Sequence, residues 1–261
     1  MVRARGHGLS RRQPRLRVRD AAAPGPHQPR PAAGRGRVEA GAVNDRFIGQ
    51  RRALLNVMQE RGIHDMNVLR AFDAVHRHEF LPSSVLHRAY EDAPVPIGFG
   101  QTASQPSLQA LYMQVLQLKP SDKVLEIGTG CGFQTAVLAQ LADRVYSVER
   151  LRDLSVRARE RLDALRVSNV ALLVGDGTIG WSRYAPYDAI LVAAAAPDVP
   201  GPLLDQMAEG GRMLIPVGSR DVQRLVCIRR VDGRYTEDEV TACTFVPLLG
   251  RFGWESEAPR G

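Results

Sequence analysis

A glycine-rich turn directly after an apolar run is the first feature whose residue types suggest chemistry. Residues 124–132 read Val-Leu-Glu-Ile-Gly-Thr-Gly-Cys-Gly. Glycine adopts positive φ without strain and lets a ligand approach the backbone, and open α/β sheets bind ligands at this carboxyl edge of the first strand. The spacing GxGxG, preceded by an acidic residue, differs from the GxGxxG of dinucleotide-binding folds and favours S-adenosylmethionine over NAD. The candidate cofactor-binding residues here are Glu126, Gly128, Thr129, Gly130 and Gly132.

Acidic residues follow the next two apolar runs. Glu149 ends the second run, where a carboxylate can accept hydrogen bonds from both hydroxyls of a ribose. Asp176, between two glycines, ends the third run, where its side chain or the adjacent backbone at Gly177 could bond the amino edge of an adenine. Each acid alone could be a surface or turn residue. At successive strand ends, the two together favour a nucleoside site.

The elements that must position these residues alternate from Lys123 onward between short apolar runs and helix-length segments. Such alternation predicts an α/β fold, with a mostly parallel sheet covered by helices on both faces. Two later runs separated by Asp232-Gly233 predict an antiparallel hairpin at one edge. The predicted strands are 124–127, 145–148, 170–174, 189–192 and 213–217, the helices between them 133–141, 151–165 and 202–208, and the hairpin strands 224–230 and 240–247.

The region before residue 119 is predicted to be mainly helical. Apolar spacing indicates helices over 46–61, beginning near an Asn-Asp cap, over 67–77, and over 106–118 with Pro106 at its start. Prolines and glycines between 94 and 100 indicate an irregular segment. We therefore predict one domain over 44–261, divided into a helical part with a flap (44–118), a cofactor-binding core (119–218) and a C-terminal hairpin and tail (219–261).

The N-terminal segment 1–43 differs in composition from the rest of the chain. Its first 41 residues hold ten arginines and two acidic residues and therefore carry +8, whereas the remainder carries −1, so the net charge of +7 of the whole chain comes from this segment. It is rich in proline and has no aromatic residue, which predicts disorder. A solvated extension or sequence translated from an upstream start is the favoured interpretation. A transit peptide, which the prolines disfavour, and a nucleic-acid arm remain alternatives.

Composition excludes several classes of protein. The chain of 261 residues is 44% hydrophobic and 24% charged, which is ordinary for a globular protein. Its three cysteines, Cys131, Cys227 and Cys243, are too few and too scattered for a disulfide framework and favour a reducing, cytoplasmic location. No run of about 18 apolar residues and no secretory signal is present, so we expect no membrane association. The histidines lack metal-ligand spacing, so no metal site is predicted.

Three further segments make the pattern more specific. Residues 96–106 read PIGFGQTASQP, residues 193–200 read AAAAPDVP, and residues 245–248 read FVPL. Together with the glycine-rich turn, and in this order, they closely resemble the protein-L-isoaspartate O-methyltransferases from about residue 45 to Trp254. The resemblance implies a Rossmann-like class I methyltransferase fold with a seven-stranded sheet, added N-terminal helices and a C-terminal antiparallel hairpin. It also implies S-adenosylmethionine as cofactor and the repair of isoaspartyl residues in damaged proteins and peptides.

The resemblance also implies roles for individual residues. Ser104 matches the active-site serine of the family, and its hydroxyl could orient the acceptor carboxylate, although a serine before Pro106 could instead cap a helix. The remaining residues are Gln101, Thr102 and Ala103 beside the cofactor, and Ala195, Pro197, Val246 and Pro247 beside the substrate. Methyl transfer needs no strong base, because such a carboxyl, with a reference pKa of about 3.3 to 3.9, is already ionised. Alignment and shielding from water are the main demands.

Two positions depart from the family pattern. Ser107 stands where relatives often carry an aromatic residue or histidine beside the cofactor, and Ala193 replaces a common threonine near the substrate. Both changes bear on affinity and rate more than on the type of reaction. Cys131 in the glycine-rich turn is interpreted as a small filler residue and not as a nucleophile.

Three hypotheses follow. The first is a carboxyl methyltransferase acting on L-isoaspartyl residues, expected to be a monomer. The second is an RNA methyltransferase that uses the arginine-rich segment to bind phosphate, which the near-neutral remainder of the chain disfavours. The third is a catalytically silent adaptor that binds the cofactor or isoaspartyl ends, disfavoured because Ser104 and the glycine-rich turn are both present.

Overall fold

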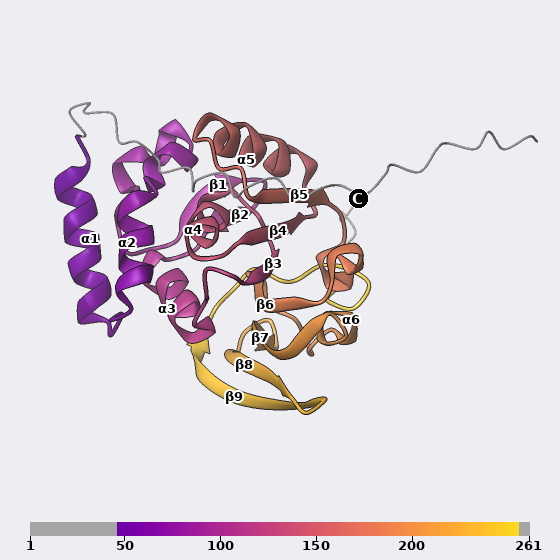
Figure 1. Cartoon of the computed structure of the whole chain (residues 1–261). Coiled ribbons are helices and arrows are strands. Elements are labelled where there is room, and N and C mark those ends of the chain that lie inside the picture. Colours follow the sequence, from indigo (N-terminus) through magenta and orange to yellow (C-terminus); the bar gives the residue numbers. More distant parts are fainter. Residues whose placement is uncertain (1–45, 256–261) are drawn as a thin grey trace, which may run out of the picture. The chain divides into compact units, whose positions relative to one another are not determined.

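Seven strands form one sheet in the computed structural model, which describes residues 46–255 (Figure 1). Its strand order is β5-β4-β3-β6-β7-β8-β9. The first five strands in this order run parallel, and β8 and β9 add an antiparallel edge. The strands are β3 (Lys123–Ile127), β4 (Arg144–Glu149), β5 (Val170–Val174), β6 (Tyr187–Val192), β7 (Met207–Gly218), β8 (Gln223–Val231) and β9 (Arg234–Cys243). The predicted α/β fold with a seven-stranded sheet is therefore confirmed.

The central strands are mostly apolar because both of their faces are covered. In β3, Val124 packs in the core on one face of the sheet, whereas Leu125 and Ile127 pack in the core on the other. This alternation follows the two-residue period of a strand. It also places Glu126 on the same face as Val124, beneath α4 (Phe133–Leu141). An acidic side chain is thus carried into the core by its position in the strand.

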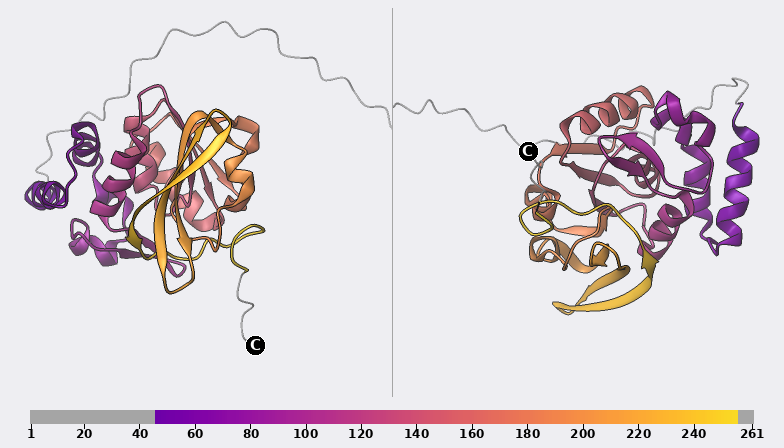
Figure 2. Two further views of the ribbon diagram at one scale, coloured as in Figure 1. Left: turned by 90° about the horizontal axis from the view of Figure 1, so that it is seen from below. Right: turned by 180° about the vertical axis from the view of Figure 1, so that it is seen from behind.

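Helices cover the two faces unequally. One core cluster receives side chains from α1 (Ile48–Glu60), α2 (Met66–Ala74), α3 (Pro106–Leu116), α4 and α5 (Arg152–Ala164). The cluster on the other face receives Leu203 from the single turn α6 (Gly201–Leu204) and Tyr184 from a short 3-10 helix. Figures 1 and 2 show α1 lying outside α2 at the edge of this layer. None of the helices within 46–255 is long and apolar enough to cross a membrane.

The N-terminal helices lie where the apolar spacing predicts them, with shifted ends. The first begins after Phe47, without a capping side chain, and the Asn-Asp pair predicted as its cap lies outside the described residues. The second begins after Asp65, whose side chain accepts hydrogen bonds from the N–H groups of Asn67 (2.8 Å) and Val68 (3.3 Å). Asp65 is therefore a true N-cap. The predicted extension 1–43 also lies outside the described residues.

The segment predicted to be irregular between 94 and 100 instead belongs to a hairpin. Strands β1 (Val95–Gly98) and β2 (Gln101–Ala103) pair antiparallel, and Phe99 at the tip has a positive φ of 54°. The side chains of Val95 and Ile97 are buried, whereas Pro96 between them is exposed. Pro96 is tolerated because this two-stranded sheet consists only of edges. We call residues 95–103 the flap.

Two predicted boundaries near the C-terminus are wrong. The helix predicted over 202–208 ends at Leu204, and β7 already begins at Met207. The second hairpin strand covers Arg234–Cys243 rather than 240–247. Its first six residues are exposed and polar, so no apolar pattern marks them. They are in a strand because they pair with β8, in a register that places Glu237 opposite Ile228.

Candidate active site

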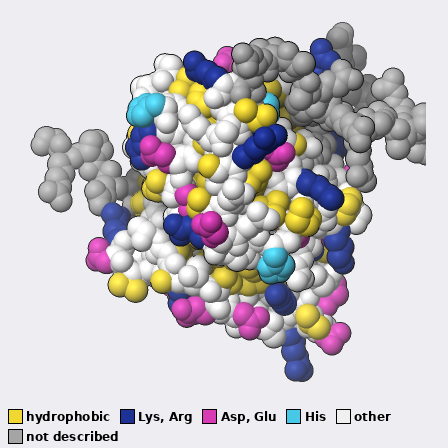
Figure 3. Space-filling model, turned by 90° about the vertical axis from the view of Figure 1, so that its left-hand side faces the viewer, with side chains coloured by type: hydrophobic (Ala, Val, Ile, Leu, Met, Phe, Trp, Pro, Cys, Tyr) yellow, Lys and Arg dark blue, Asp and Glu magenta, His cyan; other side chains and the backbone are white. Residues whose placement is uncertain are grey.

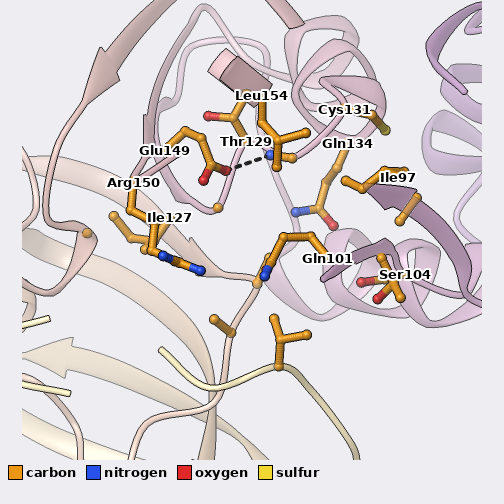
Figure 4. A pocket seen from close by; sticks show the side chains of 18 of the residues that line it. Ile97, Gln101, Ser104, Ile127, Thr129, Cys131, Gln134, Glu149, Arg150 and Leu154 are labelled. Atoms are coloured by element: carbon orange, nitrogen blue, oxygen red, sulfur yellow. Dashed lines mark hydrogen bonds between the residues drawn. The ribbon is translucent and has the colours of Figure 1, made fainter. Parts of the chain in front are cut away.

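A cavity lies at the carboxyl ends of β3, β4 and β6, between the flap and the segment after β9 (Figure 4). Five parts of the chain build it: the flap, the glycine-rich turn, the end of β4, the turn after β6 and residues 246–249. Figure 4 shows the side chains of Gln101, Gln134 and Arg150 converging on the same space. The predicted site residues that line it are Gln101, Thr102, Ala103, Ser104, Gly128, Thr129, Gly130, Glu149, Gly177, Val246 and Pro247.

The glycine-rich turn needs glycine for two different reasons. Gly130 has a φ of 55°, and a Cβ atom there would lie 3.3 Å from the flap residue Ile97. Gly132 has a φ of 89°, and a Cβ atom there would lie 3.1 Å from Ala158 of α5. Gly130 therefore keeps space inside the cavity, whereas Gly132 does not line the cavity and allows the turn to pack on a helix.

Glu149 is the acidic side chain that lines the cavity. It is only 6% exposed, and its two carboxylate oxygens accept hydrogen bonds from the N–H groups of Gly130 and Leu151, both at 2.9 Å (Figure 4). An ionised carboxylate has about four acceptor positions, so each oxygen can accept one more donor. A pair of ribose hydroxyls supplies two such donors. The backbone of the turn thus holds Glu149 in an orientation suited to a nucleoside.

Glu126 was predicted to bind the cofactor, but it does not line the cavity. Its side chain is fully buried and accepts hydrogen bonds from Gln134 Nε2 (3.0 Å), Thr135 Oγ1 (2.5 Å) and Ser147 Oγ (2.6 Å). Burial raises the pKa of Glu126 to about 7, although the three donors act in the opposite direction. Because Gln134 does line the cavity, Glu126 acts on the site through the amide that it orients.

The raised pKa of Glu126 predicts an unusual contribution to the pH dependence of stability. A group whose pKa is higher in the folded state stabilises the protein fully below its unfolded value of 4.5, and this stabilisation is lost as the pH rises through about 7. Raising the pH from 5 to 7.5 should therefore lower the free energy of unfolding of the wild type by at least about 1.4 kcal/mol more than that of Glu126→Gln. This difference corresponds to a shift of one pKa unit. Urea unfolding at both pH values measures this difference.

The control for this prediction is Glu160→Gln, which replaces an exposed glutamate of α5. Its free energy of unfolding should follow that of the wild type at both pH values. If Glu126→Gln also follows the wild type, Glu126 is ionised throughout this range and the raised pKa is wrong.

Asp176 also lies outside the cavity, which the adjacent Gly177 lines instead. One carboxylate oxygen of Asp176 accepts from the N–H (2.8 Å) and hydroxyl (2.7 Å) of Thr178, and the other accepts from the N–H of Arg251 (2.8 Å). Partial burial raises the pKa of Asp176, but these donors outweigh it and hold the pKa below its ordinary value. Asp176 therefore ties the C-terminal segment, one wall of the cavity, to the end of β5.

Two of the four predicted substrate residues do not reach the cavity. Ala195 is buried, and its backbone holds the C-terminal segment through hydrogen bonds with Val246 and Leu248, both 2.8 Å long. Pro197 lies further along the same turn and also does not line the cavity. Val246 and Pro247 do line it, together with Ala193. The turn after β6 therefore contributes Ala193 as a wall and Ala195 as an anchor.

Ser104 lies where the cavity meets a second hollow. This groove runs from Arg61 past Leu108 and Leu111 to residues 241–246, and it shares Thr102, Ser104, Ala193 and Val246 with the cavity. The N-cap of α3 is Gln105, without a side-chain capping bond, so Ser104 does not serve as the cap that its position could suggest. The hydroxyl of Ser104 is thus available at the junction of the two hollows.

Ser107 does not face the cavity. Its N–H donates to one carboxylate oxygen of Asp92 (2.8 Å), and its hydroxyl donates to the other (2.9 Å). The same carboxylate accepts from Gln105 Nε2 (2.9 Å). Ser107 therefore holds the start of α3 in place, a role that an aromatic residue or histidine at this position could not fill in the same way.

Several lining residues were not predicted from the sequence. The apolar ones sit beside predicted residues in the strands and turns, whereas Gln109 and Gln134 lie inside helices of mostly apolar sequence. A buried glutamine in such a helix is the one signal that could have identified them. The unpredicted lining residues are Ile97, Gln109, Ile127, Cys131, Gln134, Val148, Arg150, Leu154, Ala193, Ala194, Leu248 and Leu249.

Comparison with known proteins agrees with this geometry. The family model of protein-L-isoaspartate(D-aspartate) O-methyltransferase matches residues 49–253. The chain belongs to this family. Protein-L-isoaspartate O-methyltransferase 2 of Geotalea uraniireducens is 50% identical over 211 residues, covering 80% of this chain and 97% of that protein. The corresponding enzyme of Dictyoglomus turgidum is 47% identical over 206 residues, covering 79% and 94%.

A solved structure from Plasmodium falciparum, described as a protein-L-isoaspartate O-methyltransferase in complex with S-adenosyl-L-homocysteine, matches with a TM-score of 0.68 and 27% identity. The match covers 76% of this chain and 98% of that chain. The sequence-based predictions of the protein-L-isoaspartate O-methyltransferase family and of its fold are thus both confirmed.

Proposed function

We propose that this chain transfers the methyl group of S-adenosylmethionine to the α-carboxylate of L-isoaspartyl residues in damaged proteins and peptides. In the methyl ester the leaving group is methoxide, which departs far more readily than the oxide of a carboxylate. The neighbouring backbone nitrogen can therefore close on the ester carbonyl, release methanol and form a succinimide, which hydrolyses in part to normal aspartate. The observation that carries this proposal is the junction of cavity and groove at Ser104 in a chain of this family.

The cavity residues suit S-adenosylmethionine. Bound there, the cofactor supplies a methyl group attached to a positively charged sulfur. Glu149 presents two free acceptor positions for a ribose, and Gly128 and Gly130 of the glycine-rich turn line the same cavity. Gly177 lines the cavity just beyond the end of β5, and glycine is needed there because a Cβ would lie 2.4 Å from a methyl group of Ile127. We assign Glu149, Gly128, Thr129, Gly130 and Gly177 to cofactor binding.

The groove is the proposed site of the isoaspartyl peptide. It meets the cavity at four residues, so a peptide lying along the groove can direct one carboxylate into the cavity. There the Ser104 hydroxyl donates a hydrogen bond to one carboxylate oxygen and holds the other free to react. No side chain has to remove a proton, because the acceptor is already ionised at neutral pH. Ser104 is thus assigned to alignment of the acceptor.

The flap and the C-terminal segment exclude water from the reacting atoms. Ile97 from the flap, Leu154 from α5 and Leu248 from the C-terminal segment supply apolar wall to the cavity. Removal of water strengthens the interactions of Glu149 and Ser104 with their ligands and prevents competing hydrolysis. The proposed active form is a monomer, because one chain supplies every one of these walls. We place it in the cytoplasm, consistent with three unpaired cysteines.

The test of this function compares two peptides that differ only in one linkage. The protein and labelled S-adenosylmethionine are mixed with a peptide containing isoaspartate or with the same peptide containing aspartate. We expect the isoaspartyl peptide to be labelled at least about 100 times faster. Its α-carboxylate lies on a side branch of the backbone and can enter the cavity, whereas normal aspartate has its α-carbonyl in the peptide bond and offers only a β-carboxylate. Scintillation counting of base-labile methyl ester measures both rates.

Labelling of both peptides at equal rates would contradict the proposed selectivity. Labelling of neither by a protein that binds S-adenosyl-L-homocysteine would contradict the function. Transfer RNA is the control acceptor for the second hypothesis and should remain unlabelled. On the face that carries α1, basic and acidic side chains are interspersed, with no continuous basic stripe for a nucleic acid (Figure 3).

A further inference from the structure

Arg77 is a buried cation that the function described above does not use. It belongs to a 3-10 turn (Arg77–Phe80), and it is only 1% exposed. Among the described residues no carboxylate forms an ion pair with it, and Asp92, which is itself paired with Arg61, attracts it only at longer range. Burial lowers the pKa of Arg77 to about 10, which leaves the group charged at neutral pH. Because a buried charge without a counter-ion is costly, its position calls for an explanation.

The guanidinium of Arg77 lies directly behind Ser104. Its two terminal nitrogens both donate to the carbonyl oxygen of Ser104 at 3.1 Å, and one also donates to Gln109 Oε1 at 3.1 Å. The ring of Phe133 lies 5.2 Å from the centre of the guanidinium. The strongest contacts of this charge are therefore made with the residue at the junction of cavity and groove.

Arg77 is also one end of a buried polar chain, which we define as Arg77, Gln109, Gln134 and Glu126. Gln109 Nε2 donates to Gln134 Oε1 at 3.2 Å, and Gln134 Nε2 donates to Glu126 Oε1 at 3.0 Å. A guanidinium can only donate, so it fixes the orientation of the first amide, and that amide fixes the second. Both amides line the cavity. Arg77, the positive end of this series of hydrogen-bonded side chains, contacts Ser104, and Glu126, the acidic end, lies in the core.

Asp92 holds the same segment from the opposite direction. Its carboxylate accepts from the N–H and hydroxyl of Ser107 and from the side chain of Gln105. Arg77 holds the carbonyl of Ser104 and Asp92 holds the start of α3, so both ends of the segment Ser104–Ser107 are fixed. This arrangement fixes the backbone from which the Ser104 hydroxyl extends, without a bond to the hydroxyl itself.

We propose that Arg77 is a positioning residue for the methyl acceptor, which fixes Ser104 from behind and gives the junction a positive charge that favours a carboxylate. This inference rests on the proposed function. In a site of low dielectric constant, a charge one residue away attracts an anionic acceptor more strongly than it would in water. Arg77 is therefore expected to contribute to the choice of a carboxylate acceptor as well as to its alignment.

The test compares two peptides by equilibrium binding to the protein saturated with S-adenosyl-L-homocysteine. One peptide carries the isoaspartyl α-carboxylate, and the other carries the neutral α-carboxamide at the same position. The wild type should bind the carboxylate peptide more tightly, and Arg77→Met should reduce this preference about tenfold. Arg77→Lys should keep the preference but lower kcat at least about fivefold, because an ammonium does not reproduce the forked contacts of a guanidinium.

Arg51→Met is the matched control. Arg51 is another buried arginine, 9% exposed, but it lies in α1 and its Nε donates to Asp73 Oδ1 at 2.9 Å. Its loss should lower the midpoint of thermal unfolding without changing the preference for the carboxylate. The Kd of S-adenosyl-L-homocysteine should stay within about threefold in all of these variants. A merely structural role for Arg77 predicts that Arg77→Met behaves as Arg51→Met does.

The inference is overturned if folded Arg77→Met keeps the wild-type preference, or if Arg77→Lys keeps the wild-type kcat. Arg77→Gln, which is neutral but polar, replaces Arg77→Met if the latter does not fold, and the same loss of preference is expected. The failure of this inference is separate from failure of the proposed function. In the first case the wild type still methylates the isoaspartyl peptide, whereas in the second it does not.

Discussion

Replacing Glu149 with glutamine is expected to weaken the binding of S-adenosyl-L-homocysteine by about 100-fold. The carboxylate of Glu149 is fixed by the N–H groups of Gly130 and Leu151 and has two acceptor positions left for ribose hydroxyls. A hydrogen bond to a charged group contributes about 1.5–3 kcal/mol, so weakening two of them accounts for a change of this size. The amide would also direct N–H groups toward a backbone N–H. Isothermal titration calorimetry measures the Kd.

The matched control is Glu160→Gln, which removes one negative charge from the exposed side of α5. It should bind S-adenosyl-L-homocysteine as the wild type does. Thermal unfolding of Glu149→Gln shows whether the variant is folded. A folded Glu149→Gln with a Kd within threefold of the wild type would remove Glu149 from the cofactor site.

Replacing Ser104 with alanine is expected to lower kcat/KM for an isoaspartyl peptide by about 30-fold. A hydroxyl that donates to a charged carboxylate contributes about 1.5–3 kcal/mol, and alanine removes that donor without adding bulk. The backbone carbonyl that Arg77 holds is unchanged in this variant. The Kd of S-adenosyl-L-homocysteine should therefore stay within about twofold. Steady-state kinetics together with calorimetry separate the two effects.

Ser107→Ala is the control for this result. It removes a hydroxyl from the same segment, but one that is bonded to Asp92. We expect a loss of about 1 kcal/mol in the free energy of unfolding and a clearly smaller loss of kcat/KM than in Ser104→Ala, because the N–H of Ser107 and the side chain of Gln105 still bond Asp92. Equal losses of kcat/KM in the two variants would mean that Ser104 acts only through the shape of the segment. An unchanged kcat/KM in Ser104→Ala would exclude the assigned role.

The parallel core was predictable because its strands are covered on both faces. Such strands consist of continuous apolar runs, and the residues 124–127 and 189–192 stand out for that reason. Strand β9 and the flap were not predictable in the same way. The first half of β9 is exposed and polar, and the flap contains Pro96 and three residues with positive φ. Both are strands because each pairs with its neighbour in a hairpin, and the apolar pattern within a single strand does not record that pairing.

The residues of the candidate site also differ in how far the sequence predicts them. Glu149 and the glycine-rich turn meet because parallel strands end at one edge of the sheet, so order along the chain predicts their proximity. Glu126 and Asp176 are also acidic and lie at or near strand ends, yet their carboxylates accept hydrogen bonds from Gln134 and Arg251. Whether an acid at a strand end faces a ligand or the protein depends on the packing of other segments around it.

By itself, the sequence determined the family, the α/β core, the glycine-rich turn, Glu149 and Ser104, since each of these depends on residue types at short spacing. Only the tertiary structure decided that Arg77 lies behind Ser104, that Asp92 holds the start of α3, and that Gln109 and Gln134 line the cavity. Such contacts join residues that are 15 to 32 positions apart. They form because burial leaves polar groups no solvent partner, so each must find its partner in a distant part of the chain.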